Sequence, residues 1–104
     1  MSESLNDTDV WTEITLRIPP ELNGYESDIK RVVDAAIFKL RRNAHRGKWT
    51  DLAIEPALRG LDSEVDELKI AVANGNTLEI WTEAADVMNM ALIVAAIALE
   101  QQGV

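Results

Sequence analysis

The sequence predicts an all-α protein, an antiparallel helical bundle with one short β-strand near its N-terminus. Three stretches of the chain repeat apolar residues at helical spacing, and short connectors rich in glycine or polar residues separate them. The residues at about 10–18 alternate instead, as strand residues do. The 104 residues suit one domain, and the 47% of hydrophobic residues allow a small core that dimerisation would enlarge.

Residues 1–27 form an acidic N-terminal arm that precedes the helices. We expect residues 1–9 to be disordered, because they are small, acidic and turn-forming. The alternation runs from Val10 to Ile18, and Pro19-Pro20 closes the segment. A single strand cannot bury itself, so this one must pair with another copy of the chain or cover a helix.

Residues 28–104 form the predicted helical domain, which begins with a helix starting at Asp28 and capped by Ser27. This first helix should end near residues 43–46, before Gly47. Its apolar stripe consists of Ile29, Val33, Ala36, Ile37, Leu40 and Ala44.

The second and third helices are joined by a short turn. Pro56 suits the first turn of the second helix, and Asn74-Gly75-Asn76 should end it. Thr77 can cap the third helix, which should run to about Gln102. The apolar stripe of the second helix consists of Leu58, Leu61, Val65, Leu68 and Val72.

Charge and composition exclude several classes of function. The net charge of −8 argues against general nucleic-acid binding, which needs a basic face. A basic segment at residues 29–50 does lie between two acidic ones, and it suits an anionic ligand or the chain's own acids. There is no cysteine, hence no thiolate chemistry. The apolar run from Val87 to Leu99 is too short to span a bilayer, so we expect a cytoplasmic protein without a membrane partner.

Two acidic residues, Glu83 and Asp86, stand inside the most apolar helix. At about 100° per residue they share a stripe with Val87 and Met90, where a packed helix places its core side chains. Burying a carboxylate is costly unless a partner compensates its charge. The acids are therefore either neutral and hydrogen-bonded or bound to a cation.

A second acidic pair, Glu64 and Glu67, has the same spacing one helix earlier. Glu67 lies seven residues before Asn74, and Glu83 lies seven after Asn76, so antiparallel packing should bring the two pairs to one level. Four converging carboxylates would repel without a counter-charge. Hard oxygen ligands of this kind select Mg²⁺, Mn²⁺ or Ca²⁺ rather than zinc.

The double motif Glu64-x-x-Glu67, 15 residues, Glu83-x-x-Asp86 resembles the signature of the all-α, MazG-like nucleoside triphosphate pyrophosphohydrolases. The resemblance covers about residues 29–100, whereas residues 1–28 match nothing that we can name. The supporting segments are 61–68, 83–94 and, similar to short phage-type members, 39–49.

The resemblance implies magnesium-dependent cleavage between the α- and β-phosphates, giving a nucleoside monophosphate and pyrophosphate, with Mn²⁺ as a substitute metal. It also implies a bundle completed by oligomerisation, as a homodimer or homotetramer. The implied metal-binding and catalytic residues are Glu64, Glu67, Glu83 and Asp86. The candidate substrate-binding residues are Lys39, Arg42, His45, Lys48, Trp49 and Asn89.

Other interpretations of these residues stay open. Lys39 and Arg42 could belong to a solvated face or pair with acids elsewhere, and His45 could only complement a helix end. Trp49 could be a core or interface aromatic, and Asn89 could fix the register between helices. The rival function is a non-catalytic helical module that binds nucleotides or assembles with partners. Cleavage of another phosphate bond, an alarmone or a dinucleotide would use the same metal chemistry.

Overall fold

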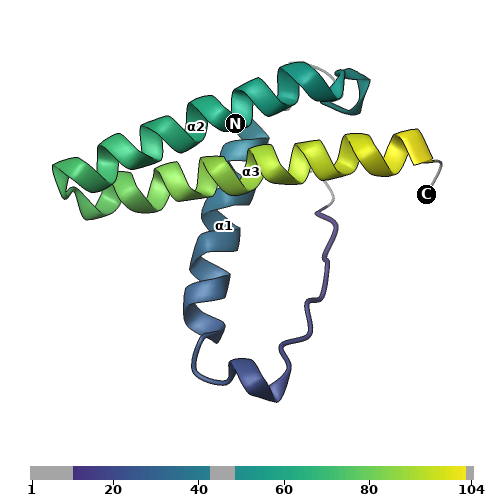
Figure 1. The fold of residues 1–104 in the computed structure, drawn as a ribbon. Helices are drawn as coiled ribbons and strands as arrows, with labels where there is room; N and C mark the ends of the chain where they lie inside the picture. The colour runs from purple at the N-terminus through teal and green to yellow at the C-terminus, as the bar shows by residue number, and fades with distance from the viewer. Residues whose placement is uncertain (1–10, 43–48, 103–104) are drawn as a thin grey trace, which may run out of the picture.

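The computed structural model describes residues 11–42 and 49–102. All regular secondary structure in these ranges is helical, which confirms the predicted all-α class (Figure 1). The two longest helices form an antiparallel hairpin, and the first long helix crosses it (Figure 1). In chain order the elements are the 3-10 helix η1 (Pro20–Leu22), α1 (Glu26–Arg42), the 3-10 helix η3 (Trp49–Asp51), α2 (Ile54–Asn74) and α3 (Thr77–Gln102).

The predicted strand at 10–18 is not formed, because residues 11–19 have no regular secondary structure and no strand occurs in the described ranges. An isolated strand has no neighbour for its backbone N–H and C=O groups. The alternation nevertheless places every second side chain on one side. Ile14, Leu16 and Ile18 line a groove of about 290 Å³ together with α1. The predictions for residues 1–9 and Val10 lie outside the described residues.

α1 begins earlier than the sequence predicts, at Glu26 rather than Asp28. The carbonyl of Tyr25 accepts the backbone N–H of Ile29 at 2.9 Å, so Ser27 lies inside the first turn and is not the cap. The Glu26 carboxylate accepts the N–H of Gly24 at 2.6 Å, which ties the start of the helix to the preceding turn. The predicted end near residues 43–46 lies outside the described residues.

The turn between α2 and α3 is where the sequence places it. α2 ends at Asn74, and Gly75 adopts the left-handed conformation (φ 72°) in which its N–H reaches the carbonyls of Ala71 and Val72, both at 3.1 Å. The cap of α3 is Asn76 rather than Thr77. Its side-chain oxygen accepts the N–H of Glu79 at 3.0 Å, whereas Thr77 is already helical.

Small residues dominate the interior. Among the residues whose burial the structure describes, the buried apolar ones are Ala36, Ala57, Ala71, Ala85 and Ile97, and the buried polar one is Asn89. α2 and α3 approach closely at Gly60, where an added Cβ would lie 2.7 Å from Cε of Met90. Large apolar side chains remain exposed on the outer faces, among them Phe38 at 63% and Leu92 at 47%.

α3 is apolar over more of its length than the run from Val87 to Leu99, which Asn89 interrupts. Among the described helices, the stretch Thr77–Gln101 is long and apolar enough to cross a membrane by length and composition. This is weak evidence for a span, since core helices of soluble proteins meet the same test. Only 17% of the tested window is buried within the single chain.

Candidate metal centre

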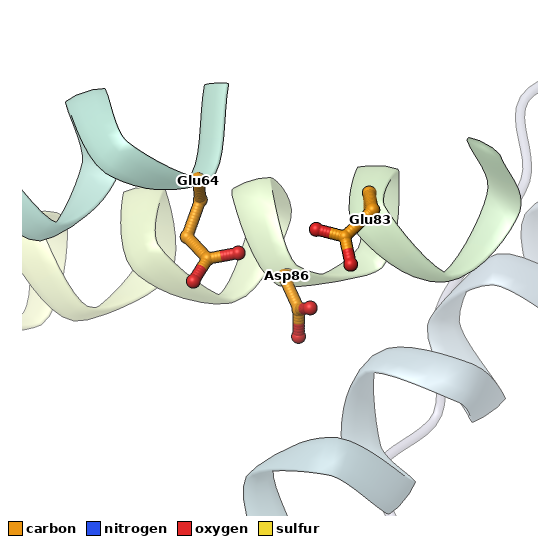
Figure 2. Close-up of side chains that lie close together, drawn as sticks. All are labelled: Glu64, Glu83 and Asp86. Atoms are coloured by element: carbon orange, nitrogen blue, oxygen red, sulfur yellow. The ribbon is translucent and has the colours of Figure 1, made fainter. Parts of the chain in front are cut away.

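Three of the four predicted acids converge between α2 and α3. Oxygen atoms of Glu64, Glu83 and Asp86 all lie within 4.8 Å of one another. Glu64 comes from α2, and Glu83 and Asp86 come from successive turns of α3. Their carboxylates point into a common space on one side of the hairpin (Figure 2). All three side chains are half-buried.

The local sequence explains why these side chains meet. Glu83 and Asp86 are three residues apart and therefore share a face of α3, one turn from each other. The tight turn at Gly75 makes α2 antiparallel to α3, so residues equally far from the turn lie at one level. Glu64 stands ten residues before Asn74, and Asp86 stands ten after Asn76. This register brings the two helices' acids together.

The electrostatics of the cluster are unfavourable to two of its charges. Burial raises the pKa of the Glu64 carboxyl above its usual value of 4.5, and the neighbouring charge of Asp86 raises it further. Burial is also the largest cause of the raised pKa of Glu83, followed by the charges of Glu67 and Asp86. Each of these carboxylates would gain from a nearby cation.

The hydrogen bonding of the same two residues is incomplete. The Oε2 atoms of Glu64 and Glu83 are buried, and neither has a hydrogen-bond partner in the structure. Buried carboxylate oxygens are normally paired, because an unsatisfied one loses its hydration without compensation. Two unpartnered oxygens beside a third carboxylate form a hard-oxygen donor set that fits Mg²⁺ or Mn²⁺.

The fourth predicted acid, Glu67, stands at the edge of this cluster. Its side chain is exposed, and its oxygens are not among those that lie within 4.8 Å of one another. It is nevertheless close to Glu83, because a side-chain hydrogen bond between the two contributes to the raised pKa of Glu83. Glu67 therefore faces Glu83 as expected, at the solvent side of the centre.

A basic side chain from α1 reaches the cluster. Nζ of Lys39 lies 2.8 Å from Oδ2 of Asp86, and both side chains are about a quarter exposed, at 24% and 26%. Lys39 also lowers the pKa of both Glu64 and Glu83, against the larger effects that raise them. Lys39 therefore pairs with an acid, which is one of the roles that the sequence leaves open for it.

The other candidate substrate-binding residues lie in varied surroundings. Nδ2 of Asn89 donates to the carbonyl of Ala36 at 2.9 Å, a buried contact that ties α3 to α1. Asn89 is 7% exposed, so the structure places it between helices. Arg42 is exposed at the described end of α1, and Trp49 is half-buried in η3, which packs on α3. His45 and Lys48 lie outside the described residues.

Several contacts of basic residues were not anticipated from the sequence, and two of them involve α3. The first is the pairing of Lys39 with Asp86 in particular, for which a signal existed: Lys39 follows the buried Ala36 by three residues and so flanks the packed face of α1. The second is the guanidinium of Arg31, which lies 5.2 Å from the ring centre of Trp81. The sequence does not identify the partners of Lys39 and Arg31, because they depend on where α1 crosses α3.

Comparison of the chain with models of protein families, with curated proteins and with solved structures gives no match.

Proposed function

We propose that this chain is a magnesium-dependent nucleoside triphosphate pyrophosphohydrolase with a MazG-like helical fold. It would add water across the bond between the α- and β-phosphates and release a nucleoside monophosphate and pyrophosphate. The observation that supports this proposal is the centre itself, three carboxylates within 4.8 Å, two of them with a buried and unpartnered oxygen. The resemblance of the double acidic motif supplies the reaction class.

Glu64, Glu83 and Asp86 would hold the cation. A bound Mg²⁺ supplies Lewis-acid polarisation of phosphate oxygens and lowers the pKa of a coordinated water. The protein's own contribution is to fix three carboxylates on two rigid helices, so that little reorganisation is needed when the substrate arrives. Glu67, which is exposed beside Glu83, would orient the attacking water and accept its proton.

The substrate's phosphates also need positive charge outside the metal centre. Lys39 lies at the cluster, and Arg42 is exposed three residues further along α1. Both belong to the basic segment of residues 29–50, the main concentration of positive charge in an otherwise acidic chain. We propose this part of α1 as the side from which the triphosphate enters.

The reaction is tested with a panel of ribo- and deoxyribonucleoside triphosphates, with Mg²⁺ or with chelator, resolving pyrophosphate from orthophosphate. We expect monophosphate and pyrophosphate only when Mg²⁺ is present, and the panel names the preferred base and sugar. Glu83→Gln and Asp86→Asn should abolish turnover while the helical content survives. Asp62→Asn is the matched control, since Asp62 is an exposed acid of α2. Full activity in Glu83→Gln would refute the assignment of the centre.

A second candidate is a non-catalytic module that keeps the acids for structural reasons. The observation that favours it is the ion pair of Lys39 with Asp86, which already supplies the cluster with an internal cation. Thermal unfolding with and without Mg²⁺ separates the two. A protein that binds the ion is stabilised as RT ln(1 + [Mg²⁺]/Kd), whereas a purely structural acidic cluster shows no specific shift.

We further propose that the chain acts as a homo-oligomer, a dimer or a tetramer. Large apolar side chains stay exposed on the described helices, and a second copy of the chain would cover them. The outer face of α3, with Met88, Leu92 and Leu99 exposed by 42–52%, is the proposed contact. Sedimentation of the parent and of Leu92→Glu tests it, since the charge should yield monomers.

A further inference from the structure

Lys39 is a cation already present at the acidic centre, paired with Asp86. We propose that Lys39 is an exchangeable counter-ion: its ammonium holds Asp86 while the centre lacks metal, leaves Asp86 when a divalent cation binds, and then contacts phosphate oxygens of the substrate. This inference rests on the proposed function, and it assigns to one residue a role in both states of the centre.

Lys39 belongs to α1, whereas the acids belong to the α2–α3 hairpin, so the ammonium is brought in by a separate element (Figure 1). It lies 2.8 Å from one oxygen of Asp86. An ion bound by Asp86 and its two neighbours would stand close to that ammonium. Like charges at such a separation repel, so the metal and Lys39 compete for the same carboxylate.

One ammonium does not balance the charge of the three clustered carboxylates. Three carboxylates carry three negative charges, and one ammonium leaves two of them without compensation. Glu64 and Glu83 keep buried, unpartnered Oε2 atoms even though Lys39 lies near enough to lower both of their pKa values. The cluster with Lys39 alone is therefore incomplete, and a divalent cation compensates it better than the ammonium does.

After it leaves Asp86, the ammonium of Lys39 stays close to the centre. Lysine carries its charge on a flexible four-carbon stem, so moving the ammonium needs rotamer changes and no displacement of α1. α1 stays attached to α3 through Asn89 and the carbonyl of Ala36. A released ammonium therefore remains at the rim of the centre with three hydrogen-bond donors, which suits the oxygens of a metal-bound phosphate.

The test is calorimetric titration of the metal-free protein with Mn²⁺ and Mg²⁺, without nucleotide. We expect Lys39→Met to bind the ion about three- to tenfold more tightly than the parent, because no ion pair must be broken. Lys30→Met is the matched control: Lys30 lies on the same helix and pairs with the exposed Asp34 at 2.6 Å. Lys30→Met also removes one positive charge, but at a position away from the centre, and it should change the affinity for the metal ion by less than about twofold.

The proposed contact of Lys39 with phosphate oxygens is tested by the binding of inorganic pyrophosphate at saturating Mg²⁺. Lys39→Met should bind it about tenfold more weakly than the parent, whereas Lys30→Met should not. If Lys39→Met does not fold, Lys39→Gln replaces it, since its amide can still bond to Asp86.

The outcomes separate this inference from the function on which it rests. Tighter metal binding together with weaker pyrophosphate binding in Lys39→Met supports it. Metal binding that is equal in parent and variant, or weaker in the variant, overturns it and leaves the metal centre standing. No metal binding by either protein overturns both proposals. An unchanged affinity for pyrophosphate overturns the transfer of the ammonium to phosphate.

Discussion

Replacing Asn89 with alanine tests how α1 is held against the hairpin. Asn89 is 7% exposed and donates to the carbonyl of Ala36 at 2.9 Å. A neutral hydrogen bond of this kind contributes about 1 kcal/mol to stability, and the small cavity left behind adds to the loss. The carbonyl of Ala36 keeps its partner within α1, so no buried acceptor is orphaned. We therefore expect a destabilisation of about 1–2 kcal/mol.

For a chain of this size, that loss corresponds to a Tm lower by about 5–15 °C. The assay is thermal unfolding followed by far-UV circular dichroism in the presence of chelator. Asn89→Leu is the companion variant, because it removes the amide while filling most of the volume, and it should cost less than Asn89→Ala. A Tm for Asn89→Ala within about 2 °C of the parent would refute the reasoning. Lost turnover at unchanged Tm would instead make Asn89 a substrate contact.

Three further predictions concern pH, the α2–α3 turn and the core. Burial raises the pKa of Glu83 above 4.5, so the folded chain holds this proton more tightly than the unfolded chain does. The contribution of Glu83 to the stability of the fold therefore falls as the pH rises from 4.5 through the raised pKa. The Tm advantage of Glu83→Gln over the metal-free parent should therefore be absent in acid and grow toward neutral pH; an advantage that is constant with pH would contradict this. Gly75→Ala should cost about 1–2 kcal/mol by chemical denaturation, because φ is 72° and the space around the added Cβ is open, so backbone strain alone opposes it. Ile97→Ala, at the most buried large side chain, should cost about 2–5 kcal/mol, enough to unfold much of a marginal protein at 37 °C in a dichroism melt; a loss below about 1 kcal/mol would show that α3 is not packed there.

Local sequence signals were sufficient to predict the hairpin and most of its acidic centre. Gly75 between two asparagines fixes the turn, and an equal number of residues on either side then fixes which acids meet. The register of Glu64 with Asp86 follows from counting alone. The spacing of three residues between Glu83 and Asp86 likewise determines their common face.

The features that the sequence did not determine depend on nonlocal contacts or on competing caps. Whether Lys39 faces Asp86 depends on the angle at which α1 crosses α3, and neither helix alone encodes that angle. Ser27 and Thr77 are good caps in isolation, but Tyr25 and Asn76 precede their helices in the structure. The alternating segment before Pro19 has the strand pattern but no adjacent strand with which to form a ladder.

The close approach of α2 and α3 at Gly60 has a consequence for the spacing of the centre. Gly60 precedes Glu64 by four residues, and Met90 follows Asp86 by four, so this contact lies one helical turn from the acids. The size of the side chain at position 60 therefore affects how far apart α2 and α3 lie, and with it the distance between the facing carboxylates. An alanine there needs only a rotation of the flexible Met90 tip, whereas a branched residue would wedge the helices apart. The separation of the acids of α2 from those of α3 thus depends on a glycine one turn away, which has no side chain of its own.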